Sequence, residues 1–162
     1  MTIAVGDTVP NATLSQMGEN GPETVELGDK LKGHKVVLFG LPGAFTGTCT
    51  SAHVPSFIRT KGDFDAKGVD EIICVAVNDP FVMDAWGKST GAAEAGISML
   101  ADPASDYTKA VGLEFSAPPV GFFDRSSRYA MYIEDGVLKV LHREEGPGVC
   151  ELSGGEAMLA AI

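Results

Sequence analysis

The sequence is poor in cysteine and in basic residues, and both shortages restrict what the protein can do. Its 162 residues include three cysteines, an odd and low number that argues against a secreted scaffold held by disulfides. Lys and Arg total 12 against 22 Asp and Glu, which gives a net charge of −10. Such a chain repels phosphate backbones, and it contains no run of basic residues, so we expect no nucleic-acid partner.

Several motifs with known chemistry are absent as well. The sequence has no CxxC pair, no P-loop, no dinucleotide fingerprint and no His/Cys spacing typical of zinc, so we expect no metal site. No apolar run approaches about 18 residues, so we expect no membrane span. The N-terminal MTIAVGDTVP does not resemble a signal peptide. We therefore expect a cytoplasmic protein, or an organellar one from which a transit peptide was removed.

The residues that are present suit a globular domain. Hydrophobic residues make up 44% of the chain, which is enough for a core, and the length predicts a single domain over residues 1–162. Apolar runs at 35–40 and 71–77 are typical of strands buried on both faces. After them, the spacing of Val54, Phe57 and Phe64 predicts a helix that ends near residue 68, and Asp79 with Pro80 predicts the start of another. Further expected elements are short strands at 12–14, 23–27 and 97–100, a turn or short helix over 102–111, a hairpin of 129–133 with 137–141, and a C-terminal helix opened by a capping box of Ser153 and Glu156.

This order of elements predicts the fold class. Strands alternate with helices, then a hairpin and a final helix follow. A parallel βαβ core with an added antiparallel hairpin is the layout of thioredoxin-like α/β proteins. We therefore predict three layers, α/β/α, around a mixed central sheet.

The stretch LPGAFTGTCTSAHVP, residues 41–55, places Cys49 where the first of the buried strands turns into a helix. Ligands and catalytic groups collect at that end of open α/β sheets. In the first helical turn, free amide groups and the helix dipole favour the reactive thiolate over the thiol. A buried structural thiol is the alternative interpretation. The Gly- and Thr-rich surroundings of Cys49 favour the reactive one.

The segment from Pro42 to Cys49, which reads Pro, three residues, Thr, two residues, Cys, resembles the peroxidatic motif of the peroxiredoxins. The form PGAFT with His53-Val54-Pro55 after it is similar to the type II, or atypical two-cysteine, subfamily. The segments VNDPFVMDAW and RYAMYIEDG resemble later parts of the same subfamily, in the right order. The resemblance covers most of the chain, and it implies a thioredoxin-fold thiol peroxidase that needs no metal, haem or flavin.

The resemblance also implies roles for individual residues. The Cys49 thiolate would attack a hydroperoxide and become a sulfenic acid. The Thr46 hydroxyl would hold the sulfur and the peroxide oxygen, and Pro42 would shield the sulfur. Arg128 would stabilise the thiolate and the polarising O–O bond. The backbone amides of Thr48 and Cys49 would supply further donors.

Three neighbouring residues leave questions open. Arg125 lies near enough along the chain to compete with Arg128, and only the resemblance favours Arg128. Gly47 stands where the family commonly has proline, which predicts a looser loop. His53 follows Cys49 by one turn, as in a Cys–His hydrolase pair, but such enzymes take their base from far along the chain. A packing or capping role is the favoured interpretation of His53.

Cys74 and Cys150 are both candidates for resolving the sulfenic acid. Cys74 lies in a predicted buried strand, at a spacing from Cys49 that some type II members use, and it can pair only if the structure shifts. Cys150 lies in a Gly- and Pro-rich loop that resembles the C-terminal resolving position of other members. Glutathione or a glutaredoxin attacking Cys49 directly is a third route, which we favour; thioredoxin is the alternative reductant.

The resulting prediction is a peroxidase for hydrogen peroxide and small organic hydroperoxides, with a role in antioxidant defence and redox homeostasis. The resemblance also implies a homodimer. A redox-responsive binding protein or chaperone, in which oxidation of Cys49 changes a surface, is the alternative. The presence of Thr46 together with a candidate arginine favours the enzyme, because a sensor needs only the thiol.

Overall fold

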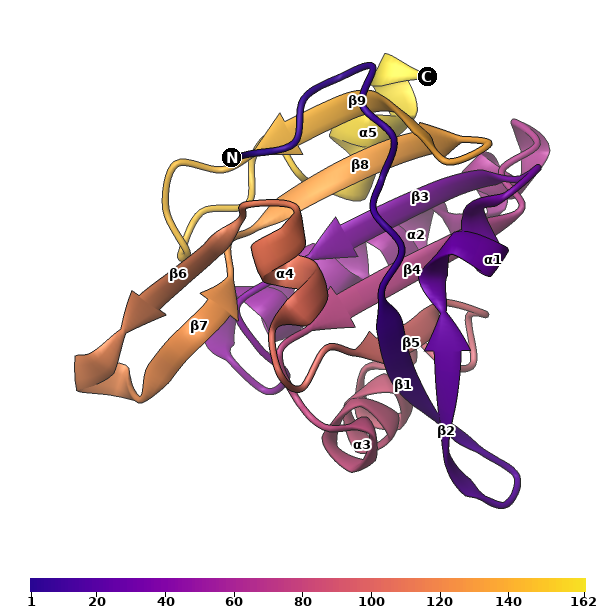
Figure 1. Cartoon of the computed structure of the whole chain (residues 1–162). Coiled ribbons are helices and arrows are strands. Elements are labelled where there is room, and N and C mark those ends of the chain that lie inside the picture. The colour runs from indigo at the N-terminus through magenta and orange to yellow at the C-terminus, as the bar shows by residue number, and fades with distance from the viewer.

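A computed structural model describes all residues, 1–162, and is built on one seven-stranded sheet (Figure 1). The strand order is β2-β1-β5-β4-β3-β8-β9. The three central strands run parallel, and the strands on either side of them pair antiparallel. The sheet is therefore mixed, as predicted. Its strands are β1 (Thr13–Gly18), β2 (Gly21–Glu26), β3 (Lys35–Gly40), β4 (Glu71–Ala76), β5 (Ser98–Ala101), β8 (Tyr129–Glu134) and β9 (Val137–Arg143).

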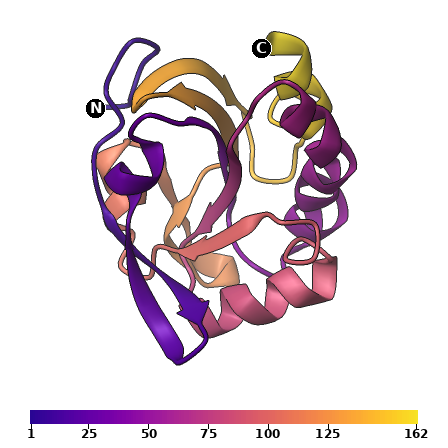
Figure 2. The ribbon, with the colours of Figure 1, turned by 90° about the vertical axis from the view of Figure 1, so that its right-hand side faces the viewer.

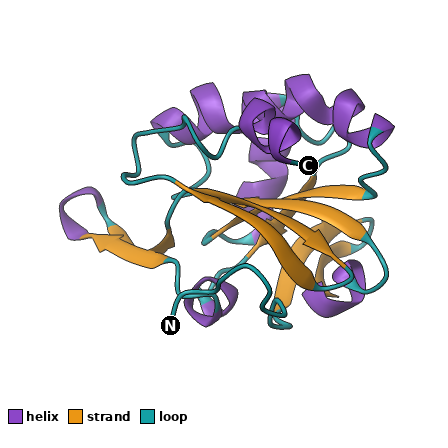
Figure 3. Cartoon of the chain, turned by 90° about the horizontal axis from the view of Figure 1, so that it is seen from above, coloured by secondary structure: helices purple, strands orange, loops and turns teal.

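Helices cover both faces of this sheet (Figure 3). Alternate residues of β3 divide between two cores: Val37 and Phe39 pack with α2, α3 and α5, while Val36 and Leu38 pack with α1 and α4. This alternation confirms the predicted three-layer α/β/α arrangement. The helices are α1 (Leu27–Leu31), α2 (Val54–Ala66), α3 (Pro80–Thr90), α4 (Asp106–Ala110) and α5 (Gly155–Ala161). None of them is both long and apolar enough to cross a membrane.

The ends of two helices test the sequence interpretation. The Asp79 side chain accepts a hydrogen bond from Val82 N at 2.9 Å and caps α3, as predicted. The predicted capping box of Ser153 is wrong, because α5 begins at Gly155 with Gly154 as its cap. Ser153 Oγ instead donates to the Glu144 carboxylate, a stronger acceptor that the sequence pattern did not reveal.

Close packing of α5 on α2 explains the glycine at the start of α5 (Figure 2). Gly155 N donates to Ser56 Oγ at 2.9 Å, and a side chain at position 155 would collide with Ser56 and Thr60. The chain that leads into α5 is thereby held beside the start of α2.

Three parts of the fold were not predicted. The first is a separate hairpin of β6 (Glu114–Ala117) and β7 (Phe122–Ser126), joined by a 3₁₀ turn (Pro118–Val120), which projects beside the ends of β3 and β4 (Figure 1). It pairs with no other strand of the protein, and its half-exposed side chains give no core pattern. The second is α1, whose first residue, Leu27, was predicted to end a strand.

A π-helical turn, η1 (Cys49–His53), leads into α2 and was also not predicted. Val54 N donates to Cys49 O, one residue further back than in an α-helix. Pro55 follows directly; its nitrogen carries no proton, and its ring would clash with the carbonyl of Ser51 in regular α geometry. The wider turn relieves that clash. Single π turns of this kind are frequent at functional sites.

Candidate active site

Cys49 lies at the start of the helical segment that follows β3. The chain leaves β3 at Gly40, passes through a turn at Phe45 with φ +63°, and becomes helical at Gly47. Thr50 N donates to Thr46 O at 3.1 Å, which is the first hydrogen bond of that helical segment. The side chain of Cys49 is fully buried. Its predicted position in the first helical turn is confirmed.

Arg128 is the side chain that reaches the sulfur. It immediately precedes β8, and the pairing of Tyr129 with Gly40 sets it beside the end of β3. Arg128 is only 2% exposed, and its Nη2 lies 3.2 Å from Cys49 Sγ. Nη2 also donates to Pro147 O at 2.8 Å, and Nη1 lies 3.0 Å from His53 Nδ1. A charged donor with three partners is therefore held against the thiol inside the protein.

Arg125 occupies a different place. Its Nη1 donates to Pro42 O at 3.0 Å, and its guanidinium lies 4.9 Å from the centre of the Phe122 ring. It therefore ties the projecting hairpin to the loop before Cys49. Of the two candidate arginines, the structure brings Arg128 to the sulfur.

His53 is neutral, and both of its ring nitrogens have hydrogen-bond partners. Its Nε2 lies 3.0 Å from Ser153 O, a pure acceptor, so Nε2 carries the proton and Nδ1 accepts from Arg128. Burial, with a further contribution from Arg128, lowers the pKa of His53 to about 3. The ring also packs against Phe39 and Phe57. His53 has no free nitrogen with which to deprotonate Cys49, which argues against a Cys–His hydrolase.

The backbone amides predicted as donors are available. Neither Thr48 N nor Cys49 N donates a hydrogen bond to another protein group. The Thr46 hydroxyl donates to Gly43 O at 2.7 Å and makes no hydrogen bond with Cys49 Sγ. The Thr48 hydroxyl donates to Gly148 O at 3.1 Å, which joins this turn to the chain after β9.

A cavity of about 300 Å³ opens beside these groups. Its walls come from the loop before Cys49, the projecting hairpin, Arg128 and the chain after β9. The lining residues are Pro42, Thr46, Gly47, Thr48, Val120, Phe122, Arg128, Pro147 and Gly148. Elsewhere in the protein, no group of three or more His, Cys, Asp or Glu side chains is arranged to hold a metal ion.

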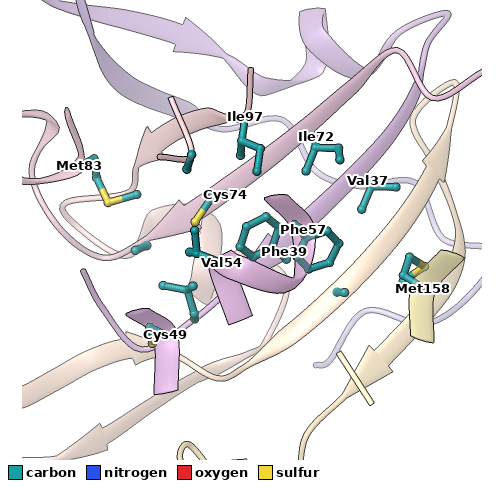
Figure 4. Packing of buried hydrophobic residues seen from close by; sticks show 14 of the residues in the cluster. Val37, Phe39, Cys49, Val54, Phe57, Ile72, Cys74, Met83, Ile97 and Met158 are labelled. Carbon is teal, nitrogen blue, oxygen red and sulfur yellow. The ribbon is translucent and has the colours of Figure 1, made fainter. Parts of the chain in front are cut away.

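All three cysteines are free thiols. Cys74 on β4 is fully buried in the same apolar cluster as Cys49, and Figure 4 draws Val54 between the two in that view. Burial, followed by the nearby Cys49, raises the pKa of Cys74 well above its ordinary value. Cys150 is half-buried, with its sulfur 4.0 Å from Ser153 Oγ, and burial raises its pKa as well.

Sequence reasoning missed two groups at this site. Val120 and Phe122 line the cavity from a hairpin that was not predicted. Pro147 and Ser153 supply the carbonyl groups that hold Arg128 and His53. Every residue has a main-chain carbonyl, so the sequence does not show which carbonyls bind side chains. Only the Gly-Pro-Gly sequence at 146–148 indicated a turn in this segment.

Comparison with known proteins gives the family. A family model described as Redoxin matches residues 4–159. Peroxiredoxin-2E-2, chloroplastic, of Oryza sativa subsp. japonica is 48% identical, over 99% of this chain and 73% of that protein. The chain belongs to the peroxiredoxin family. This membership confirms the resemblance and makes the protein a thiol peroxidase with the thioredoxin-like fold.

Other relatives match this peroxiredoxin along its whole length. Peroxiredoxin-2B of Arabidopsis thaliana is 44% identical over 99% of this chain and 98% of its own. The crystal structure of reduced Prx3 in complex with H2O2 from Vibrio vulnificus matches with a TM-score of 0.92 and 47% identity, covering 99% of each chain.

The looser active-site loop that was predicted at Gly47 can be tested by substitution. It is exposed, its amide makes no hydrogen bond within the protein, and a side chain there would meet nothing within 4 Å. Proline suits such a first helical residue. We expect Gly47→Pro to raise the free energy of unfolding by about 0.4–1 kcal/mol in urea titrations and to retain peroxide turnover. Loss of turnover would contradict the assignment of this loop. Gly43→Ala, whose methyl group would displace the end of Arg125 from Pro42 O, is the control and should give no gain in stability.

Proposed function

We propose that this peroxiredoxin reduces hydrogen peroxide and small organic hydroperoxides at Cys49 and is reset by glutathione with glutaredoxin. The observation that carries the proposal is the 3.2 Å contact between Arg128 Nη2 and Cys49 Sγ, two side chains that are both buried. A permanent positive charge at that distance favours the thiolate, which is the nucleophilic form of cysteine. The proposed reaction uses residues of this chain and an external thiol, with no metal, haem or flavin.

In the proposed first step, the Cys49 thiolate attacks the terminal oxygen of the peroxide. A sulfur–oxygen bond forms as the oxygen–oxygen bond breaks, so the sulfur loses two electrons and becomes a sulfenic acid. The departing hydroxide or alkoxide takes a proton and leaves as water or alcohol. Arg128 and the amides of Thr48 and Cys49, which have no acceptor within the protein, would stabilise the charge that develops on these oxygens.

Thr46 and Pro42 have roles in this proposal that follow from their positions. Because the Thr46 hydroxyl proton points to Gly43 O, its lone pairs are left to accept the O–H of a peroxide in the cavity that Thr46 lines. Pro42 lies buried in the wall of the same cavity and keeps water from the sulfur.

The role of Thr46 predicts a specific pattern of activity. Thr46→Val keeps the shape of the side chain but removes the acceptor, so the rate constant with hydrogen peroxide should fall about a hundredfold. Thr46→Ser keeps the hydroxyl and should stay within about tenfold of the native rate. The only tryptophan, Trp86, donates to Thr50 Oγ1 at 3.1 Å next to Cys49, so its fluorescence can report oxidation in stopped-flow experiments. Equal rates for the valine and serine variants would contradict this role.

The reset step follows from the states of the other two thiols. Cys74 is fully buried with a raised pKa, and Cys150 is half-buried with a raised pKa, so neither is poised as an attacking thiolate. An external thiol would attack the sulfenic acid and release water, and a second thiol would then release reduced Cys49 and a disulfide. Thioredoxin remains the alternative reductant.

A turnover assay tests the reductant. We expect sustained peroxide consumption with glutathione and glutaredoxin, and Cys74→Ala and Cys150→Ser should each retain it. If either variant loses turnover while its first step stays fast, that cysteine resolves the sulfenic acid. Sustained turnover with thioredoxin and none with glutaredoxin would overturn the proposed reductant, and a single reaction with no turnover would indicate a sensor.

We also propose a homodimer formed at the edge of the sheet that carries Cys49. Phe45, Phe81, Val120 and Phe123 are each 57–66% exposed, and all lie in the segments that follow β3 and β4 or in the projecting hairpin. Large apolar side chains grouped this way are typical of interaction surfaces.

The location of the protein is proposed to be a reducing compartment, either the cytoplasm or an organelle, because the names of relatives include chloroplastic and mitochondrial proteins.

A further inference from the structure

Glu144, directly after β9, makes an unusual set of hydrogen bonds. A single oxygen, Oε2, accepts from the amides of Glu151, Leu152 and Ser153 at 3.0, 2.8 and 2.6 Å and from Ser153 Oγ at 2.6 Å. No lysine or arginine pairs with this carboxylate. Its bonds therefore serve to close the segment 144–153, here named the strap, into a fixed loop.

The strap holds the site at three points. Pro147 O accepts from Arg128 Nη2 at 2.8 Å, and Gly148 O accepts from the Thr48 hydroxyl at 3.1 Å. Ser153 O accepts from His53 Nε2 at 3.0 Å, and Ser153 is the residue that Glu144 binds through both its amide and its hydroxyl.

The orientation of Arg128 depends on these contacts. Its Nε is buried and has no hydrogen-bond partner, so the guanidinium is positioned by Nη1 and Nη2 alone. Their partners are His53, Pro147 and Cys49. Of these, Pro147 belongs to the strap, and His53 is held by it. Without the strap, Arg128 would lose its contact with Pro147 O. His53 would lose its hydrogen bond to Ser153 O and, apart from Arg128 itself, keep only the packing of its ring.

We propose that Glu144 is a positioning residue for the peroxidase reaction, which fixes the strap so that Pro147 O and Ser153 O hold Arg128 and His53 against Cys49. This inference rests on the proposed function of Cys49 and adds a residue that never touches the sulfur or the peroxide. Its carboxylate acts on Arg128 by two routes, one through Pro147 O and one through Ser153 O and His53. A displacement of about 1 Å in a charged donor costs up to about a hundredfold in rate.

A simpler explanation is that Glu144 matters only through its charge near Arg128, and Glu145 provides the matched control. Glu144 and Glu145 both line a cavity of about 150 Å³ on which Arg128 also borders. Glu145 is exposed and makes no hydrogen bond or ion pair with another side chain. Glu145→Gln removes the same charge and leaves the strap intact.

The first measurement is the rate constant with hydrogen peroxide, followed by Trp86 fluorescence. We expect Glu144→Ala to lower this rate constant at least tenfold. The amide oxygen in Glu144→Gln still accepts hydrogen bonds, so its rate constant should fall between those of Glu144→Ala and the native protein. Glu145→Gln should stay within twofold. Thermal unfolding of each variant identifies loss of folding, and Glu144→Gln keeps the test decisive if Glu144→Ala is unstable.

The second measurement follows the His53 ring by proton NMR and needs no peroxide. Arg128, Ser153 O and the rings of Phe39 and Phe57 surround His53, and its signals should not titrate between about pH 5 and 9 in the native protein. In Glu144→Ala or Glu144→Gln the freed strap admits water, and the signals should shift with pH.

The outcomes separate this inference from the proposed function. If the native protein does not react with peroxide, the proposed function is wrong. The His53 signals alone then decide whether Glu144 fixes the strap. Unchanged His53 signals in both Glu144 variants overturn the inference, as does a folded Glu144→Ala protein that reacts within twofold of the native rate. An equal loss in Glu145→Gln also overturns it, because charge alone would then account for the effect.

Discussion

Replacing Cys49 by serine is expected to slow the consumption of hydrogen peroxide at least about a thousandfold. Serine has nearly the same size, so the fully buried site keeps its packing, but a hydroxyl stays protonated at neutral pH and is a poor nucleophile. The contact of Arg128 with position 49 remains in the variant and has no thiolate to stabilise. The measurement is the second-order rate constant for peroxide, by stopped flow.

The other two cysteines provide the controls for this prediction. Cys74→Ala and Cys150→Ser remove thiols that have no contact with Arg128, so each variant should keep the first step within about threefold of the native rate. A Cys49→Ser protein that retains a tenth of the native rate would rule out Cys49 as the nucleophile. So would a loss confined to Cys74→Ala.

Arg128→Lys is expected to lower the same rate constant about a hundredfold or more. Lysine keeps the positive charge but is a single point donor, whereas Arg128 bridges His53, Pro147 and Cys49 with the two ends of its guanidinium. The variant therefore tests geometry apart from charge. Some loss of stability should accompany it, because the carbonyl of Pro147 and the ring of His53 lose a buried partner.

Arg125→Lys is the matched control for Arg128→Lys. It loses the contacts with Pro42 O and the Phe122 ring but none with the sulfur, so its rate should fall less than tenfold. If Arg125→Lys is the slower of the two variants at equal stability, the assignment of Arg128 as the activating arginine is wrong.

The sheet and the place of Cys49 were predictable because they follow from short-range patterns. The apolar runs of β3 and β4 required burial on both faces, and the turn-rich stretch after β3 set Cys49 at a strand end. The choice between Arg125 and Arg128 was not predictable from the residues alone. It depends on the register of β8 against β3, which pairs Tyr129 with Gly40 and which no single segment encodes.

The parts that escaped prediction rest on long-range or main-chain contacts. The hairpin of β6 and β7 contributes no residue to either apolar core, so it lacks the buried apolar run by which the other strands were predicted. Ser153 followed by Glu156 matched a helix cap, but the carboxylate of Glu144 takes the Ser153 hydroxyl. The strap binds Arg128 and His53 through carbonyl groups, which every residue has, so these contacts could be found only in the structure.

The oxygen that the reduced protein acquires from peroxide can be located by mass spectrometry. A variant that carries both Cys74→Ala and Cys150→Ser is treated with one equivalent of hydrogen peroxide, and its intact mass and peptide masses are measured. We expect a gain of one oxygen atom, confined to the peptide that contains Cys49 and reversed by glutathione. No gain, or a gain on methionine with Cys49 still a free thiol, would contradict this expectation.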